Sequence, residues 1–257
     1  MPVPARLCLV IAVIVALLIA VVTRTSAAAV KAGDLFDLCK RNDPQLNECV
    51  KDSITKLRAT FKKGIPELRV PSLDPMVVPR ISLNQGNGPV SITSSFKDLH
   101  IQGFSDVQIN SVKVDLPNFR IDVDCYLPWF YTWGDYDIKG QILILPISGN
   151  GPSWSNYTDV RGRAVITGHE VVKKNKTYFG MEDMKFDVDV GHATIHMDNL
   201  FNGNKALGDT MNQFMSDNWK AVYSELKPVI NEAVGTLLRD VAKKIFDKFP
   251  LEELFPM

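Results

Sequence analysis

The chain has 257 residues, with 29 basic and 29 acidic side chains, so its formal net charge at pH 7 is zero. A chain this close to neutral lacks the cationic surface that binding to nucleic acid or to a strongly anionic membrane requires. The length suits one large domain or two small ones, and we expect one, because no Pro/Gly/Ser-rich linker and no tandem repeat divides the chain.

The first 29 residues predict a secretory signal peptide. Arg6 precedes an unbroken apolar run from Leu7 to Val22, and small residues follow at 26–29. The run is shorter than the roughly 20 residues that cross a bilayer as a helix, so we expect cleavage near 27–29 and no stable membrane insertion. Residues 30–257 would form the single secreted domain, which we expect to be a monomer.

Cleavage would leave three cysteines. Cys39 and Cys49 lie on either side of Asp43-Pro44. In an oxidising compartment they are the pair expected to form a disulfide, which would join an N-terminal loop to the following helix. Cys125 shares one face of a predicted strand with Phe119, and there it suits a buried thiol better than a nucleophile.

Two sequons predict N-glycosylation. Asn156-Tyr-Thr and Asn175-Lys-Thr each fall in a turn-like stretch, which agrees with a secreted protein whose turns face water.

The first element after the cysteines is a short helix over residues 48–62, with Val50, Ile54, Leu57 and Phe61 on one side and a stop at Gly64-Ile-Pro. Four prolines follow between residues 66 and 79. Because proline cannot donate a hydrogen bond to a neighbouring strand, this segment suits an edge strand or an ordered crossing.

From Val90 to Met197 apolar residues alternate with polar ones, which is typical of antiparallel strands with one buried face. Val107 and Ile109 are out of register with the apolar residues at 112 and 114, so a bulge is expected between them. Turns are expected at Ser148-Gly-Asn-Gly and Lys173-Lys-Asn-Lys, and a separate last strand at residues 193–197.

The C-terminal stretch from Leu200 to Phe249 has apolar residues at steps of three and four, the spacing of a long helix. Asn202 and Asn204 offer N-terminal caps, and Pro228 predicts a kink or a break. A one-sided sheet beside such a helix indicates an α+β fold in which a strongly curved antiparallel sheet wraps the helix. If side chains leave the gap unfilled, the gap is a hydrophobic tunnel.

The sequence gives little support to an enzyme. No Gly-x-Ser-x-Gly elbow, phosphate-binding loop or His-Glu-x-x-His helix occurs, so we expect no catalytic residue, no cofactor and no metal. His192 and His196 could form a zinc site only with Asp187 or Asp189 from a neighbouring strand, as in a metal hydrolase. Their pattern better suits solvent-facing residues opposite the apolar face at 193–197.

An aromatic cluster at residues 129–136 has two readings. It could be a loop packed over a barrel end, or it could form the mouth of an apolar ligand site. Its members are Trp129, Phe130, Tyr131, Trp133 and Tyr136.

Taken together, these residues resemble the takeout and juvenile hormone-binding protein family of insects. The matching features span nearly the whole mature chain. They are the two cysteines around Asp43-Pro, Gly64-Ile-Pro-Glu-Leu with Leu73-Asp-Pro, Tyr136-Asp-Ile-Lys-Gly-Gln-Ile-Leu-Ile-Leu-Pro-Ile, Asn199-Leu-Phe-Asn-Gly-Asn-Lys-Ala-Leu-Gly with Asn218-Trp, and Phe249-Pro-Leu-Glu-Glu-Leu-Phe-Pro.

The resemblance implies a TULIP-like fold with an elongated internal pocket. Members are secreted carriers of lipophilic molecules such as terpenoid hormones or fatty-acyl lipids, and some are circadian-clock outputs linked to feeding and behaviour. The hormone carriers have a second disulfide, whereas Cys125 has no partner here, so the chain looks closer to the takeout branch.

We therefore expect a non-enzymatic carrier whose partner is a small lipophilic ligand. The alternative is a lipid- or pathogen-surface-binding protein of the same architecture, which the near-neutral charge disfavours. The side chains expected to line the tunnel come from the first helix, the sheet and the long helix: Leu57, Phe61, Ile121, Val123, Trp129, Phe130, Ile138, Ile142, Phe186, Val188, Met211, Phe214, Met215 and Trp219.

Overall fold

Six antiparallel strands form one sheet in the described part of the chain, in the order β1-β2-β4-β5-β6, with β3 paired to β4. The computed structural model describes residues 30–86 and 88–257, so the predicted signal peptide lies outside the described residues. Residues Ala32–Met257 form one compact unit. The strands are β1 Met76–Gln85, β2 Val90–Gln102, β3 Gln108–Asp115, β4 Arg120–Ile142, β5 Leu145–Lys173 and β6 Lys176–Met197.

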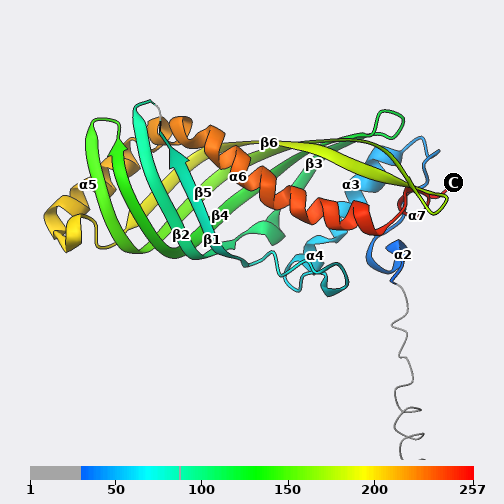
Figure 1. The fold of residues 1–257 in the computed structure, drawn as a ribbon, viewed down its shortest axis with the longest axis horizontal. Helices are drawn as coiled ribbons and strands as arrows, with labels where there is room; N and C mark the ends of the chain where they lie inside the picture. The colour runs from blue at the N-terminus through cyan, green and yellow to red at the C-terminus, as the bar shows by residue number, and fades with distance from the viewer. Residues whose placement is uncertain (1–29, 87) are drawn as a thin grey trace, which may run out of the picture. The chain divides into compact units, whose positions relative to one another are not determined.

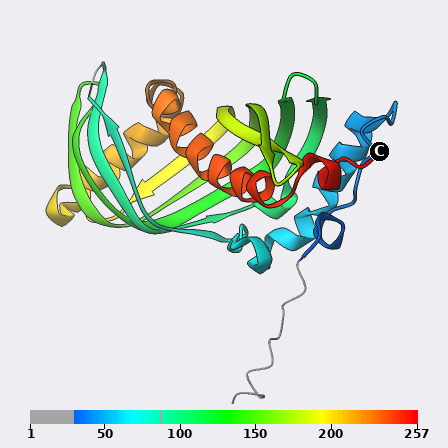
Figure 2. The ribbon, with the colours of Figure 1, turned by 45° about the vertical axis from the view of Figure 1, so that its right-hand side comes forward.

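The sheet curls around the long C-terminal helix α6, which lies on its concave side (Figures 1 and 2). The predicted α+β fold, with a strongly curved sheet around a long helix, is confirmed. The helices and 3-10 turns are α2 Ala32–Leu35, α3 Leu46–Lys56, α4 Arg58–Phe61, η1 Pro66–Leu68, η2 Phe104–Asp106, η3 Phe201–Gly203, α5 Lys205–Asp217, α6 Trp219–Lys248 and α7 Leu251–Leu254.

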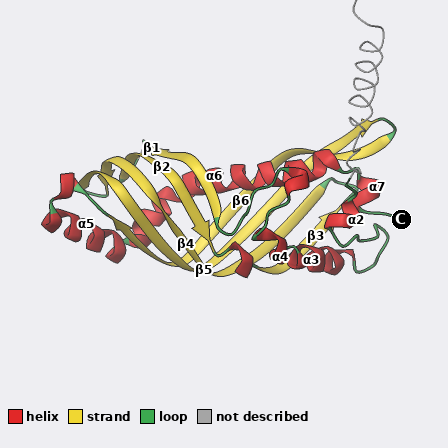
Figure 3. Cartoon of the chain, turned by 90° about the horizontal axis from the view of Figure 1, so that it is seen from below, coloured by secondary structure: helices red, strands yellow, loops and turns green. Residues whose placement is uncertain are grey.

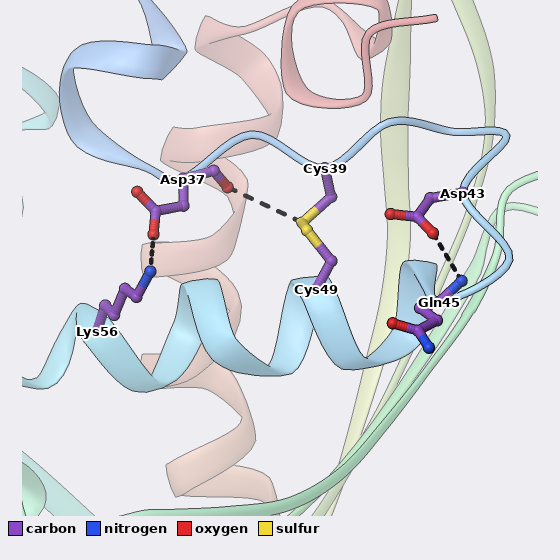
Figure 4. The surroundings of a disulfide bond; sticks show 6 residues. All are labelled: Asp37, Cys39, Asp43, Gln45, Cys49 and Lys56. Atoms are coloured by element: carbon purple, nitrogen blue, oxygen red, sulfur yellow. Dashed lines mark hydrogen bonds and ion pairs between the residues drawn. A yellow bond between two sulfur atoms is a disulfide. The ribbon is translucent and has the colours of Figure 1, made fainter.

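The disulfide between Cys39 and Cys49 joins the N-terminal loop to α3, as predicted, with an S–S distance of 2.04 Å. The loop is also held by an ion pair in which Lys56 Nζ lies 2.5 Å from Asp37 Oδ2 (Figure 4). The predicted helix over residues 48–62 is two consecutive helices, α3 and α4, separated at Leu57.

Of the two alternatives expected for the proline-rich segment, an edge strand and an ordered crossing, the edge strand is present as β1, and Pro79 lies within it. The bulge expected between Ile109 and the apolar residues that follow is also present, because the pairing of β3 with β4 shifts between Ile109 and Ser111.

Strands β4, β5 and β6 are longer than the sequence predicted, since β5 alone runs over 29 residues (Figure 3). The turn expected at residues 148–151 lies inside β5, and the true hairpin turn is at Leu143 and Ile144. The separate last strand at residues 193–197 is likewise part of β6. The turn at Lys174 and Asn175 is confirmed, with φ of 51° and 58°.

Within these long strands, the side chains that face inward switch from one set of alternate positions to the other. Leu127 and Val160 pair across β4 and β5 on the inner face, yet the next inward pair is Phe130 with Tyr157. The change falls at Asp159, whose φ is +54°, and Gly191 opposite it has no room for a Cβ, which would lie 2.6 Å from the Asp159 side chain. Strict alternation of inward and outward side chains, on which the sequence prediction relied, therefore does not continue past Asp159.

The long helical stretch is interrupted at Asn218, ten residues before Pro228, so the break predicted at Pro228 is wrong. Pro228 and Ser224 are both exposed, and water can bond to the Ser224 carbonyl that the proline leaves without a helical donor. The predicted cap is confirmed, because the Asn204 side chain accepts a hydrogen bond from the Leu207 amide at 3.2 Å.

Side chains of α5 and α6 occupy the free edge of β6. Asn212 accepts from the Met197 amide and donates to the Met197 carbonyl, both at 3.0 Å. Asn231 accepts from the Val188 amide at 3.0 Å, and the Tyr223 hydroxyl donates to the Val188 carbonyl. These side chains form the hydrogen bonds that a further strand would otherwise form. The backbone amide and carbonyl groups at this edge are therefore paired, and the edge is bound to the helices.

Candidate functional site

The concave face of the sheet carries three apolar clusters, which follow one another along β4. The α5 cluster includes Ile138 and Met215, the middle cluster includes Leu127 and Val188, and the α7 cluster includes Ile121 and Phe246. All three lie between the sheet and the C-terminal helices, where the sequence placed the ligand site.

Ten of the predicted tunnel residues fall in these clusters, and Phe186 contacts both the middle and the α7 cluster. They are distributed along the whole length of the concave face and do not converge on one point. The α5 cluster holds Ile138, Ile142, Met211, Phe214 and Met215, the middle cluster holds Phe130, Phe186 and Val188, and the α7 cluster holds Ile121, Val123 and Phe186.

Of the other four predicted residues, three are not members of these clusters. Trp129 donates from Nε1 to Asp106 at 2.8 Å, and Trp219 packs edge-on against His192 at 5.6 Å. Leu57 is half-buried at the end of α3. Phe61 ends α4, and its side chain lies outside what the structure describes.

Partly accessible side chains outnumber buried ones in the middle cluster. Four of its members are buried, whereas eight keep part of their surface accessible. In a close-packed core the inward-facing side chains of a cluster would be covered. The partly covered ones are Phe104, Ile109, Cys125, Phe130, Tyr157, Phe186, Val190 and Ile230.

Two titratable groups of this cluster, Tyr157 and Cys125, have pKa values that burial shifts. Burial raises the pKa of the Tyr157 hydroxyl, which a hydrogen bond to Ser155 opposes, and burial also raises the pKa of the Cys125 thiol. Both side chains nevertheless keep accessible surface. Groups that are surrounded by protein and still accessible are what the lining of an internal space would contain.

Polar groups inside the site are few. The Tyr157 hydroxyl and Ser155 lie at its wall, and the Tyr223 hydroxyl, bonded to the Val188 carbonyl, lies beside β6. Burial raises the pKa of Tyr223 to about 12. Both hydroxyls are therefore neutral hydrogen-bonding groups, suited to orienting a mostly apolar molecule.

The predicted aromatic cluster is neither a loop nor one side of a site, because it lies within β4 and the strand divides it between two faces. Phe130 points to the middle cluster, where its ring lies 5.7 Å from Phe104 and 5.4 Å from Tyr157. Tyr136 is buried in the α5 cluster. Tyr131 and Trp133 contact each other and belong to a separate group of rings.

The histidines and aspartates of the weak zinc hypothesis do not converge. Asp187 and Asp189 belong to β6 itself and pair with Lys227 at 3.1 and 2.6 Å, while His196 contacts Asp198 at 3.0 Å. Hydrogen bonding and proximity to Asp189, with a contribution from Asp187, raise the pKa of Lys227. Among the residues described, no group of three or more His, Cys, Asp and Glu could hold a metal ion.

Sequence reasoning missed several members of the middle cluster, including Tyr157, Val190 and Ile230. Tyr157 was seen only as the central residue of a sequon. Strict alternation along the strand would place Tyr157 on the polar face. Its side chain faces the middle cluster because the alternation shifts at Asp159, and nothing in the sequence pattern marks that shift.

In the described part of the chain no helix is long and apolar enough to span a membrane. α6 has the length, but its apolar side chains are interspersed with charged ones.

Comparisons with known proteins agree with this architecture. The family model for haemolymph juvenile hormone binding protein matches residues 13–256. The circadian clock-controlled protein daywake of Drosophila melanogaster is 26% identical over 231 residues, which cover 84% of this chain and 85% of that protein. A candidate beta-carotene-binding protein of Schistocerca gregaria is 24% identical over 218 residues, covering 84% and 86%.

A crystal structure is also similar. Takeout 1 of Epiphyas postvittana superimposes with a TM-score of 0.74 at 27% identity, covering 86% of this chain and 99% of that one.

Proposed function

This chain belongs to the haemolymph juvenile hormone binding protein family, and from that premise we propose that it is a non-enzymatic carrier of a small lipophilic ligand. The ligand lies on the concave face of the sheet, against α6, with the middle cluster at the centre of its site. The observation that carries the proposal is that the sheet and α6 bring apolar side chains together on the concave face, where several of them stay partly accessible.

The ligand is an elongated and largely hydrocarbon molecule, such as a terpenoid or a fatty-acyl lipid. Each Å² of apolar surface removed from water stabilises the complex by about 25 cal/mol. The relative described as a candidate beta-carotene-binding protein supports an isoprenoid-like cargo. Met211 and Met215 at the α5 end have side chains that adapt to different shapes.

We also propose that the protein is secreted. The signal-like sequence at residues 1–29 and the disulfide between Cys39 and Cys49 support an oxidising destination. The similarity to daywake supports expression under control of the circadian clock.

The proposal is tested on the full chain secreted from eukaryotic cells, by solvent extraction and mass spectrometry of co-purified lipids. A stoichiometric terpenoid or fatty-acyl species is the expected result. An empty extract, together with no uptake of a fluorescent fatty-acid probe, contradicts the carrier function.

Two substitutions locate the site. Val190→Trp and Ile230→Trp each add an indole to the middle cluster from a different element and should abolish probe uptake. Val172→Trp makes the same change at a position that is 64% exposed and should leave uptake intact. Circular dichroism confirms that each variant is folded, and full uptake by two folded middle-cluster variants would place the ligand elsewhere.

A further inference from the structure

A row of stacked rings crosses the sheet on the face opposite the ligand site. His100 of β2 stacks on Trp133 of β4, with ring centroids 4.9 Å apart and planes 12° apart. On the other side, Trp154 of β5 stacks on His196 of β6 at 5.4 Å and 18°. Tyr131 lies 5.6 Å from Trp133 and 6.3 Å from Trp154, so it joins the two halves.

The outer rings of the row are fixed in place. His100 Nδ1 lies 2.8 Å from the Asp98 carbonyl oxygen, and His196 Nε2 lies 3.0 Å from Asp198 Oδ1. Each histidine covers one face of a tryptophan, so Trp133 and Trp154 are held before anything binds between them.

Three of these rings, Tyr131, Trp133 and Trp154, line a shallow groove with a volume of about 590 Å³. Gln102 and Asp135 also line it. Apolar ring faces beside a carboxylate and an amide form a surface that can cover the C–H face of a sugar ring and bond to its hydroxyl or acetamido groups.

The sequon asparagine lies beside this groove. Asn156 was expected in a turn, but it is in the middle of β5, directly opposite Tyr131 of β4 and Thr194 of β6. It is two residues from Trp154 and therefore on the same face of the strand. Directly opposed residues in an antiparallel pair have Cβ atoms about 5 Å apart, so a group carried by Asn156 starts next to the Tyr131 ring.

We propose that the aromatic groove is the seat of an N-linked glycan on Asn156, with the first sugar residues packed on Tyr131, Trp133 and Trp154. The occupant is attached to the chain, which accounts for large rings left partly accessible on an outer sheet face. The inference rests on the proposed secretion, because sugar transfer takes place in that route.

The linkage forms from a lipid diphosphate-linked oligosaccharide. Nδ2 of Asn156 bonds to the anomeric carbon, and the bond from that carbon to the diphosphate oxygen breaks. The amide gives up one proton, and the lipid diphosphate leaves with the electron pair. Transfer precedes pairing of β5 with its neighbours, since Asn156 is flanked on both sides in the folded sheet.

The second sequon supplies a matched control. Asn175 is exposed in the turn between β5 and β6, away from the aromatic groove. Thr158→Val and Asn175→Asp each remove one sequon, and Asp tolerates the left-handed backbone conformation of residue 175. Glycopeptide mass spectrometry of the secreted full chain measures occupancy, and thermal unfolding and acrylamide quenching of tryptophan fluorescence measure the effect of each glycan.

We expect both asparagines to carry glycan. Thr158→Val should lower the unfolding midpoint by about 3 °C and increase quenching, whereas Asn175→Asp should change neither. Trp154→Ala should lower the midpoint in both backgrounds, because it removes the contacts with His196 and Tyr131. The decrease should be smaller in the Thr158→Val background than in the glycosylated protein, because the glycan and the ring stabilise each other.

Additive effects of Trp154→Ala and Thr158→Val on the unfolding midpoint would contradict the proposal that the glycan packs in the aromatic groove. Glycan on Asn175 with none on Asn156 would contradict it as well. Retention of the chain in cells with neither site occupied would instead contradict the proposed secretion.

Discussion

At the scale of single residues, Tyr136 links the sheet to the segment that follows it. Its side chain is 3% exposed, and its hydroxyl donates to the Asp198 carbonyl at 2.6 Å. Burial, reinforced by Asp198 and Asp137, raises the pKa of Tyr136 to about 12. The unfolded chain loses this proton near pH 10, so the stabilisation is complete below pH 10 and is lost between pH 10 and 12.

We predict that Tyr136→Phe reduces this alkaline loss, which amounts to roughly 3 kcal/mol at most for a shift of two pKa units. Urea unfolding at pH 9 and pH 11.5 measures it, in a Cys125→Ala background that prevents thiol exchange with the disulfide. The pKa of Tyr223 is also raised to about 12. The free energy of unfolding should therefore depend least on pH in the variant that combines Tyr136→Phe and Tyr223→Phe. Equal pH dependence in Tyr136→Phe and the parent would contradict this account.

At the scale of elements, the free edge of β6 depends on helix side chains for its hydrogen bonds. Asn212→Ala would leave both the amide and the carbonyl of buried Met197 without partners. We expect a loss of about 3 kcal/mol and faster hydrogen exchange at the Met197 amide. Gln213→Ala, at the next and exposed position of α5, removes only an exposed hydrogen bond to Asp217. It should cost less than about 0.5 kcal/mol and leave exchange at Met197 unchanged. Unchanged exchange at Met197 in Asn212→Ala would show that the edge is held in another way.

A second prediction concerns Pro228, which lies inside α6. The residue is exposed inside α6, so Pro228→Ala restores a helical amide without removing buried contacts. We expect the free energy of unfolding to rise by about 1 kcal/mol or more. Chemical denaturation measures the change, and a loss of stability would show that the proline serves the helix geometry.

These elements show which features a sequence can predict. The cap at Asn204, the edge strand with Pro79, the bulge after Ile109 and the turn at Asn175 depend on nearby residues, and each was predicted. The hairpin at Leu143 and Ile144 has no Gly or Asn to mark it, and the change in alternation at Asp159 depends on three adjacent strands. The pattern therefore identified the concave face and three members of the middle cluster, but it missed Tyr157, which lies next to that change.

At the scale of the whole molecule, α6 connects all three apolar clusters. It contributes Leu226 to the α5 cluster, Ile230 to the middle cluster and Phe246 to the α7 cluster. An element shared by every part of the core couples their unfolding, so we expect residues 32–257 to unfold in one transition.

Ligand binding at the middle cluster should then stabilise the whole unit. Stabilisation grows with the logarithm of ligand concentration and reaches about 2.7 kcal/mol at 100 times Kd. Far-UV circular dichroism and tryptophan fluorescence should report the same midpoint, shifted together by a fatty-acid or terpenoid ligand. Because α6 is fastened to β6 at Val188 beside that cluster, a ligand that shifted only one of the two signals would mean that the helix and sheet separate before the core unfolds.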